Sequence, residues 1–208
     1  MRHIRGVIQP ASIQPGRFAR SIWLALGALL AGVAGLRAAE TGTSVQWITN
    51  YYAVTGATPR EIRFSITQAR PWKTRFTWDG FTDWKVAWRF ETSREADGCR
   101  VANFRPVAVI TTTLPRWTPP PGVAPEVRQA WQQYSVALVQ HETVHARYAS
   151  AAVEEMNRKV PALPIMPCDE LAERINQLAN QIMDDYRRRE KDYDKRTNNG
   201  ALQGARLR

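Results

Sequence analysis

The chain has 208 residues, 44% of them hydrophobic, which is enough for one globular domain with its own core. Its formal net charge of +10 overstates the basic character of the folded part, because residues 1–39 hold five arginines and no acidic residue. The rest carries 24 of the 29 basic residues against 19 acidic ones, a net charge of +5. This excess is small and no recognised nucleic-acid-binding motif accompanies it, so we expect no nucleic-acid partner.

Residues 1–39 have the features of an export signal. Arginines precede an uncharged apolar run from Ile22 to Leu36, and small residues follow at Ala38 and Ala39. The run is shorter than the roughly 20 residues of a membrane-spanning helix, so we expect cleavage and a periplasmic or secreted protein. Arg37 disturbs the cleavage site, which leaves an uncleaved inner-membrane anchor as the alternative. Residues 40–208 are predicted to form a single domain with a short basic C-terminal tail.

Cys99 and Cys168 are the two cysteines of the chain. An exported protein enters an oxidising compartment, so a disulfide between them is the expected state. The bridge would close a loop of about 70 residues and stabilise the fold by about 4 kcal/mol in the chain-entropy model. A role for Cys168 as a zinc ligand is the alternative.

The first part of the predicted domain consists of strands and one short helix. Ser44 to Val54 is rich in β-branched and aromatic residues and is predicted to be a strand. Thr58 and Glu61 form a capping box, which predicts a helix that reaches about Gln68.

Two Asp-Gly pairs predict tight turns. Asp79-Gly80 is expected to join Phe76–Trp78 to a strand that starts at Phe81. Asp97-Gly98 supplies the next turn.

A long strand is expected from Cys99 to Leu114, in which Pro106 indicates an edge or a bulge. A free edge there could pair with an extended peptide substrate, or it could be an ordinary blunted sheet edge.

Residues 126–160 are predicted to form one long helix with an HExxH motif near its middle. Apolar residues recur at spacings of three and four, and His141 and His145 fall within the same stripe. Residues four apart lie one above the other on a helix, so both rings can bind one metal ion. Glu142 is placed to take a proton from water as a general base. Core histidines with satisfied hydrogen bonds are the alternative interpretation.

A second helix is predicted from Asp169 to about Lys191. Two long helices and a mostly antiparallel sheet define an α+β domain, and the HExxH helix makes it zincin-like. The tail from Tyr193 onward is expected to lie on the surface or to fold back over the site. Basic residues near the C-terminus could contact an anionic envelope surface, although a solvated basic face is the simpler explanation; they are Arg187, Arg188, Arg189, Lys191, Lys195, Arg196, Arg206 and Arg208.

The order of these parts resembles the predicted secreted zinc-dependent proteases, a bacterial domain family whose biological role is largely undefined. The resemblance covers residues 45–206. It rests on Cys99 at the start of a long strand, the HExxH motif, Cys168 at the start of the second helix, and the tail Tyr193-Asp194-Lys195-Arg196-Thr197-Asn198-Asn199-Gly200. The family pattern for this tail is Tyr-Asp-x-x-Thr-x-His-Gly, whose histidine is a natural third metal ligand. Asn199 stands at that position here.

The third ligand must therefore come from another residue type. His3 lies in the leader, so a carboxylate, a sulfur or an amide oxygen has to complete the site. Asp194 is the first candidate, because it lies just past the predicted end of the second helix in the matching tail. Asn199 and Asp185 are the other candidates, the latter because it lies near the buried stripe of that helix. Each could instead support a histidine or lie on the surface.

Together these features predict an exported zinc peptidase that hydrolyses peptide bonds of a polypeptide substrate. Zinc would polarise the scissile carbonyl, and Glu142 would carry a proton from water to the leaving amine. Tyr193 and Tyr148 are candidate donors to the oxyanion, or packing residues. The alternative is a non-catalytic envelope protein that keeps the fold as a structural or binding module, which Asn199 favours.

Overall fold

The computed structural model describes residues 44–72 and 78–208. The predicted export signal and the part of the predicted hairpin at Phe76 lie outside the described residues. The described elements follow the order β1, α1, β2, β3, α2, α3 and a short 3-10 helix, η1, over Ala201–Gln203. Among these elements, no helix combines the length and the apolar character that crossing a membrane requires.

Three strands form a mixed sheet with the order β1-β3-β2. β1 spans Ser44–Val54, β2 spans Phe81–Glu95 and β3 spans Gly98–Trp117. β2 and β3 are antiparallel and meet at the turn predicted from Asp97-Gly98, whereas β1 runs parallel to β3. The prediction of a mostly antiparallel sheet is therefore only partly correct. Strand composition does not encode strand direction, which is set here by the connection through α1.

β3 is the central strand of this sheet. Pro106 pairs with Trp88 of β2, and the pairing of β3 with β1 begins only at Val107. The proline thus lies where β3 has one paired neighbour among the described strands, as expected for a residue without an N–H. A bulge lies nearby, where the register shifts between Glu91 and Thr92. From Val107 onward β1 occupies the edge that was considered for an extended peptide.

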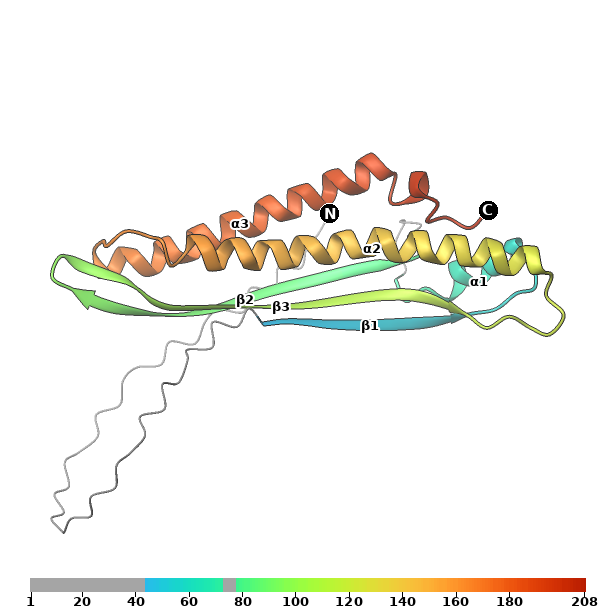
Figure 1. Cartoon of the computed structure of the whole chain (residues 1–208), viewed down its shortest axis with the longest axis horizontal. Coiled ribbons are helices and arrows are strands. Elements are labelled where there is room, and N and C mark those ends of the chain that lie inside the picture. Colours follow the sequence, from blue (N-terminus) through green and yellow to red (C-terminus); the bar gives the residue numbers. More distant parts are fainter. Residues whose placement is uncertain (1–43, 73–77) are drawn as a thin grey trace, which may run out of the picture. The chain divides into compact units, whose positions relative to one another are not determined.

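The two long helices lie on the same side of the sheet (Figure 1). α1 spans Pro59–Ala69, α2 spans Pro125–Lys159 and α3 spans Cys168–Thr197. The predicted N-cap of α1 is confirmed, because Oγ1 of Thr58 accepts a hydrogen bond from the backbone N–H of Glu61 at 3.2 Å. The Glu61 side chain reaches back as expected, but it accepts from the N–H of Ala57, at 2.7 Å, and not from that of Thr58.

Helix α3 continues beyond its predicted end at Lys191. The apolar stripe that includes Tyr186 continues two turns further to Tyr193, which is also buried. The helix ends where Asn198 adopts the left-handed conformation, with φ of 50°. Asp194 is therefore a helical residue in the last turn of α3 and does not follow the helix.

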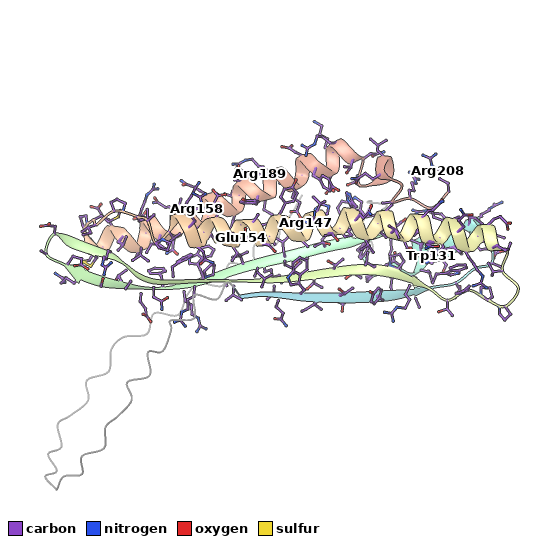
Figure 2. All side chains as sticks on the ribbon, viewed as in Figure 1. Trp131, Arg147, Glu154, Arg158, Arg189 and Arg208 are labelled. Atoms are coloured by element: carbon purple, nitrogen blue, oxygen red, sulfur yellow. A yellow bond between two sulfur atoms is a disulfide. The ribbon has the colours of Figure 1, made fainter. Side chains whose placement is uncertain are left out.

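Two hydrophobic clusters pack beneath α2, and the HExxH residues lie between them. Leu138 belongs to one cluster and Ala146 to the other, and the three polar residues fall between these positions along the helix. Ala149 and Ala152 continue the second cluster with small side chains, which lets α3 pack closely against α2. Arg147, Glu154 and Arg158, which are labelled in Figure 2, are exposed residues of α2, and Val136 and Val139 are exposed on the same helix.

A disulfide fixes the start of α3 to the sheet. Cys99 and Cys168 are bonded as predicted, with 4.9 Å between their Cα atoms. Cys99 and Met166 also exchange two backbone hydrogen bonds, at 2.8 and 3.2 Å. One end of α3 is thus anchored covalently, while its other end carries Asp194.

Candidate metal centre

The α2 residues of the motif are buried, as the apolar stripe predicts. His141 and Glu142 are each 4% exposed and His145 is 6% exposed. Nε2 of His141 and Nε2 of His145 lie 3.3 Å apart, so both rings direct the same nitrogen to one point.

Asp194 brings a carboxylate oxygen from α3 to the same point. Its Oδ1 lies 3.0 Å from Nε2 of His145 and 3.3 Å from Nε2 of His141. The three donor atoms form a triangle, and their three residues are a group that could hold a metal ion. In a tetrahedral zinc site with bonds of about 2.0–2.1 Å, two ligands lie about 3.3 Å apart. The three donors therefore have the spacing of one face of such a site, which leaves a fourth position open.

The outer nitrogens of both rings also have acceptors. Nδ1 of His141 lies 2.9 Å from Oε1 of Gln203, and Nδ1 of His145 lies 3.1 Å from Oε1 of Glu190. A side-chain acceptor at Nδ1 places the proton there and leaves the Nε2 lone pair free for a metal.

Charge holds this cluster together in the metal-free protein. Burial lowers the pKa of His145, but its hydrogen bonds to Asp194 and Glu190 outweigh burial and raise the pKa to about 10. Burial raises the pKa of Asp194, and hydrogen bonds from the two histidines outweigh this and lower it to about 2. A protonated His145 and an ionised Asp194 therefore form an ion pair where a metal would bind.

Glu142 lies beside the triangle, and a hydrogen bond fixes one of its two carboxylate oxygens. Its Oε2 accepts a hydrogen bond from Oγ1 of Thr82 at 2.7 Å, and Thr82 is 3.1 Å from Oγ1 of Thr112. Burial raises the pKa of the Glu142 carboxyl, and Thr82 and the histidines oppose the shift. A Cβ added to Gly80 would lie 2.8 Å from Oε1 of Glu142, so the glycine makes room for this carboxylate.

These groups line one pocket of about 150 Å³. α2 contributes His141, Glu142 and His145, α3 contributes its last turns, and residues 78–83 form the opposite wall. Among the charged α3 residues on the wall, Lys191 has no ion-pair partner in the described part of the chain.

A comparison with known protein families places the chain in a bacterial family. The family model described as "Bacterial protein of unknown function (DUF922)" matches residues 49–201. The chain belongs to the DUF922 family. No curated protein and no solved structure matches the chain significantly. The DUF922 match includes His141, Glu142, His145 and Asp194 but carries no activity, so membership of a zinc-protease family stays a prediction.

Two predicted ligands of this DUF922 chain lie outside the triangle. Asp185 is on the surface of α3, in ion pairs with Arg188 at 3.1 Å and Arg189 at 2.5 Å. Asn199 is exposed at the rim of the pocket, where its Oδ1 accepts a hydrogen bond from Nε1 of Trp78 at 2.8 Å. Asp185 does not belong to the group of residues that could hold a metal ion.

The two predicted oxyanion donors contact the site by packing. The Tyr193 ring stacks on His141 with 5.0 Å between ring centroids, and its hydroxyl donates to Oε1 of Gln203 at 3.1 Å. Tyr148 packs against Tyr193 and Tyr186. Neither tyrosine lines the pocket of the DUF922 chain. Of the two positions expected for the tail, on the surface or back over the site, the second agrees with the contact of Gln203 with His141.

Thr82, Glu190 and Gln203 were not predicted from the sequence. Thr82 and Gln203 lie in segments with no motif, so no local pattern identifies them. Glu190 carried a signal, because it precedes Asp194 by four residues, the same spacing that joins His141 to His145. Two such pairs, one on each helix, face each other in the candidate metal centre of this DUF922 chain.

Proposed function

We propose that the protein is an exported zinc-dependent peptidase. The observation that carries the proposal is the triangle of Nε2 of His141, Nε2 of His145 and Oδ1 of Asp194, at 3.0–3.3 Å, beside a buried Glu142. A glutamate between two histidines of a helix is the arrangement of metal-dependent peptidases, in which it serves as the base.

The donor set fits zinc. Imidazole nitrogens and an aspartate oxygen are common zinc ligands, and a catalytic zinc site has three protein ligands and one open position. Two histidines and one carboxylate also bind mononuclear iron in oxygenases. Glu142 favours zinc, since a hydrolase uses such a carboxylate as its base.

When bound, zinc supplies a Lewis acid that polarises a carbonyl and lowers the pKa of water at the site. Glu142 accepts the proton of the attacking water and delivers it to the leaving amine. Thr82 donates a hydrogen bond to Oε2 of Glu142, whereas Oε1 has no hydrogen-bond partner among the described residues. Oε1 is therefore the oxygen available for the proton. Burial raises the pKa of this carboxyl and so makes Glu142 a stronger base.

A cation on the pocket wall supports the developing oxyanion. With the hydroxyl of Tyr193 bonded to Gln203, Lys191 takes this role in the proposal. It precedes Asp194 by three residues and so lies on the same face of α3. Its ammonium has no competing ion pair among the described residues.

The alternative, a non-catalytic envelope protein, was suggested by Asn199. Its support is weakened because Asp194 supplies a third donor, so a histidine at position 199 is not needed to complete the triangle. Export, cleavage of the leader and a polypeptide substrate remain parts of the proposal, as does weak contact of the basic tail with an anionic envelope surface.

The test is digestion of an unbiased peptide library by the zinc-loaded, oxidised protein. We expect chelator-sensitive cleavage that Glu142→Gln abolishes while the bound zinc is retained. Glu154→Gln, an exposed change on the same helix, is the matched control and should cleave normally. No cleavage by a protein that holds zinc would support the non-catalytic alternative, and cleavage that survives Glu142→Gln would remove Glu142 from the mechanism.

A further inference from the structure

We propose that Glu190 is a positioning residue of the metal centre, which orients His145 and adds negative charge near the ion. The inference rests on the metal site of the proposed function but not on peptidase activity. Glu190 lies on α3, would not bind the metal ion itself, and would act on it through His145.

The contact between Glu190 and His145 is largely buried. Oε1 of Glu190 lies 3.1 Å from Nδ1 of His145, and the Glu190 side chain is only 13% exposed. The same oxygen accepts a hydrogen bond from Nε1 of Trp84 at 3.0 Å. Trp84 is fully buried in the sheet, so it gives the carboxylate a rigid reference point on β2.

Arg187 fixes the other oxygen of this carboxylate. Its Nη1 donates to Oε2 of Glu190 at 3.1 Å. The guanidinium also lies 3.5 Å from the centroid of the Trp84 ring and donates to the backbone oxygen of Trp84. Both oxygens of Glu190 are thereby held, so the carboxylate cannot rotate away from His145. A supporting group held in this way restrains the ring it contacts.

The two histidines differ in the charge of their supporting groups. His145 has the carboxylate of Glu190, whereas His141 has the neutral amide of Gln203 at 2.9 Å, and Gln203 is solvent-exposed. A carboxylate makes an imidazole a stronger electron donor than an amide does.

The count of charges gives Glu190 a second role. A divalent ion would have Asp194 as its one charged ligand, with the carboxylates of Glu142 and Glu190 beside the site. Uncompensated charge is costly in a buried environment. Glu190 adds its negative charge through His145 to the charges of Asp194 and Glu142, and its ion pair with Arg187 offsets part of this effect.

The experiment measures Zn²⁺ affinity at one fixed pH, by competition with a chromophoric chelator. Glu190→Gln keeps the size and one acceptor oxygen but removes the charge, and we expect it to weaken Zn²⁺ binding about 10–100-fold. Gln203→Glu adds a carboxylate behind His141 instead. Combined with Glu190→Gln, it should recover at least part of the lost affinity. Glu173→Gln, an exposed change on the same helix, is the matched control and should bind as the wild type does.

The outcomes separate the roles. Unchanged affinity in Glu190→Gln would overturn the inference. A loss that Gln203→Glu does not reduce would overturn the charge role and leave the orientation of His145 as the role of Glu190, because only a charge effect is restored from the other ring. A wild-type protein that binds no Zn²⁺ would overturn both this inference and the proposed metal centre. A protein that binds Zn²⁺ with the expected variant pattern but cleaves no peptide would leave this inference intact and remove the peptidase assignment.

Discussion

Oδ1 of Asp194 lies 3.0 Å from Nε2 of His145, although the two residues belong to different helices. The contact exists because α3 packs along α2 and continues far enough to place its last turn opposite the HExxH motif. The candidate metal centre is therefore a property of the helix pair, and a change that shifts α3 will alter it.

The metal-free protein should show a pH dependence set by this contact. Because the pKa of His145 is raised to about 10, its stabilising effect is complete below its unfolded value of about 6.5 and is lost as pH rises towards 10. Because the pKa of Asp194 is lowered to about 2, its effect is complete above about pH 3.9 and is lost as pH falls through 2. We expect the contribution of the pair to peak between about pH 4 and 6.5.

Urea unfolding of the chelated protein across this pH range provides the measurement, with His145→Gln as reference. The difference in the free energy of unfolding between wild type and variant should shrink as pH rises from 6.5 to 10. A difference that stays constant over this window would mean that His145 is not held as a cation by its carboxylate neighbours.

Gly200 should be required for the position of His141. Its φ is +78°, and an added Cβ would lie 2.9 Å from Cγ of the His141 ring. Gly200→Ala should therefore lower both stability and metal affinity. Gly122→Ala is the matched control, because Gly122 has a similar φ of +76° but nothing within 4 Å of an added Cβ. The free energy of unfolding of Gly122→Ala should fall by about 1 kcal/mol from backbone strain alone, and its metal affinity should be unchanged. Equal metal affinity in the two variants would show that Gly200 is not needed to position the ring of His141.

The disulfide should contribute strongly to global stability. Cys99 and Cys168 are 69 positions apart, and removing the cross-link should cost about 4 kcal/mol through the entropy of the unfolded chain. Urea unfolding of the Cys99→Ser/Cys168→Ser double variant, both proteins saturated with metal, measures this loss. A midpoint equal to that of the oxidised wild type would contradict the anchoring role given to this end of α3.

Local patterns in the sequence were sufficient for the helices and for the motif. The spacing of apolar residues placed His141 and His145 on the buried face, and the matching tail made Asp194 the first candidate ligand. The predicted helix end at Lys191 is too early because the apolar stripe of α3 continues to Tyr193, seven residues after Tyr186.

Contacts between elements could not be predicted in the same way. Thr82 meets Glu142 only because β2 passes beneath α2, and Glu190 meets Trp84 only because α3 lies against β2. The parallel direction of β1 likewise depends on how the chain returns through α1 and not on the composition of the strand.

The most direct test of the metal centre is the zinc content of the purified, zinc-loaded protein after dialysis, compared with Asp194→Ala and Asp185→Ala. Both changes remove an aspartate from α3, but only Asp194 lies within 3.3 Å of the histidine nitrogens. We predict one Zn²⁺ per chain in the wild type and in Asp185→Ala, and little or none in Asp194→Ala. Zinc retained at wild-type level by Asp194→Ala, or iron bound in preference to zinc by the wild type, would contradict the account.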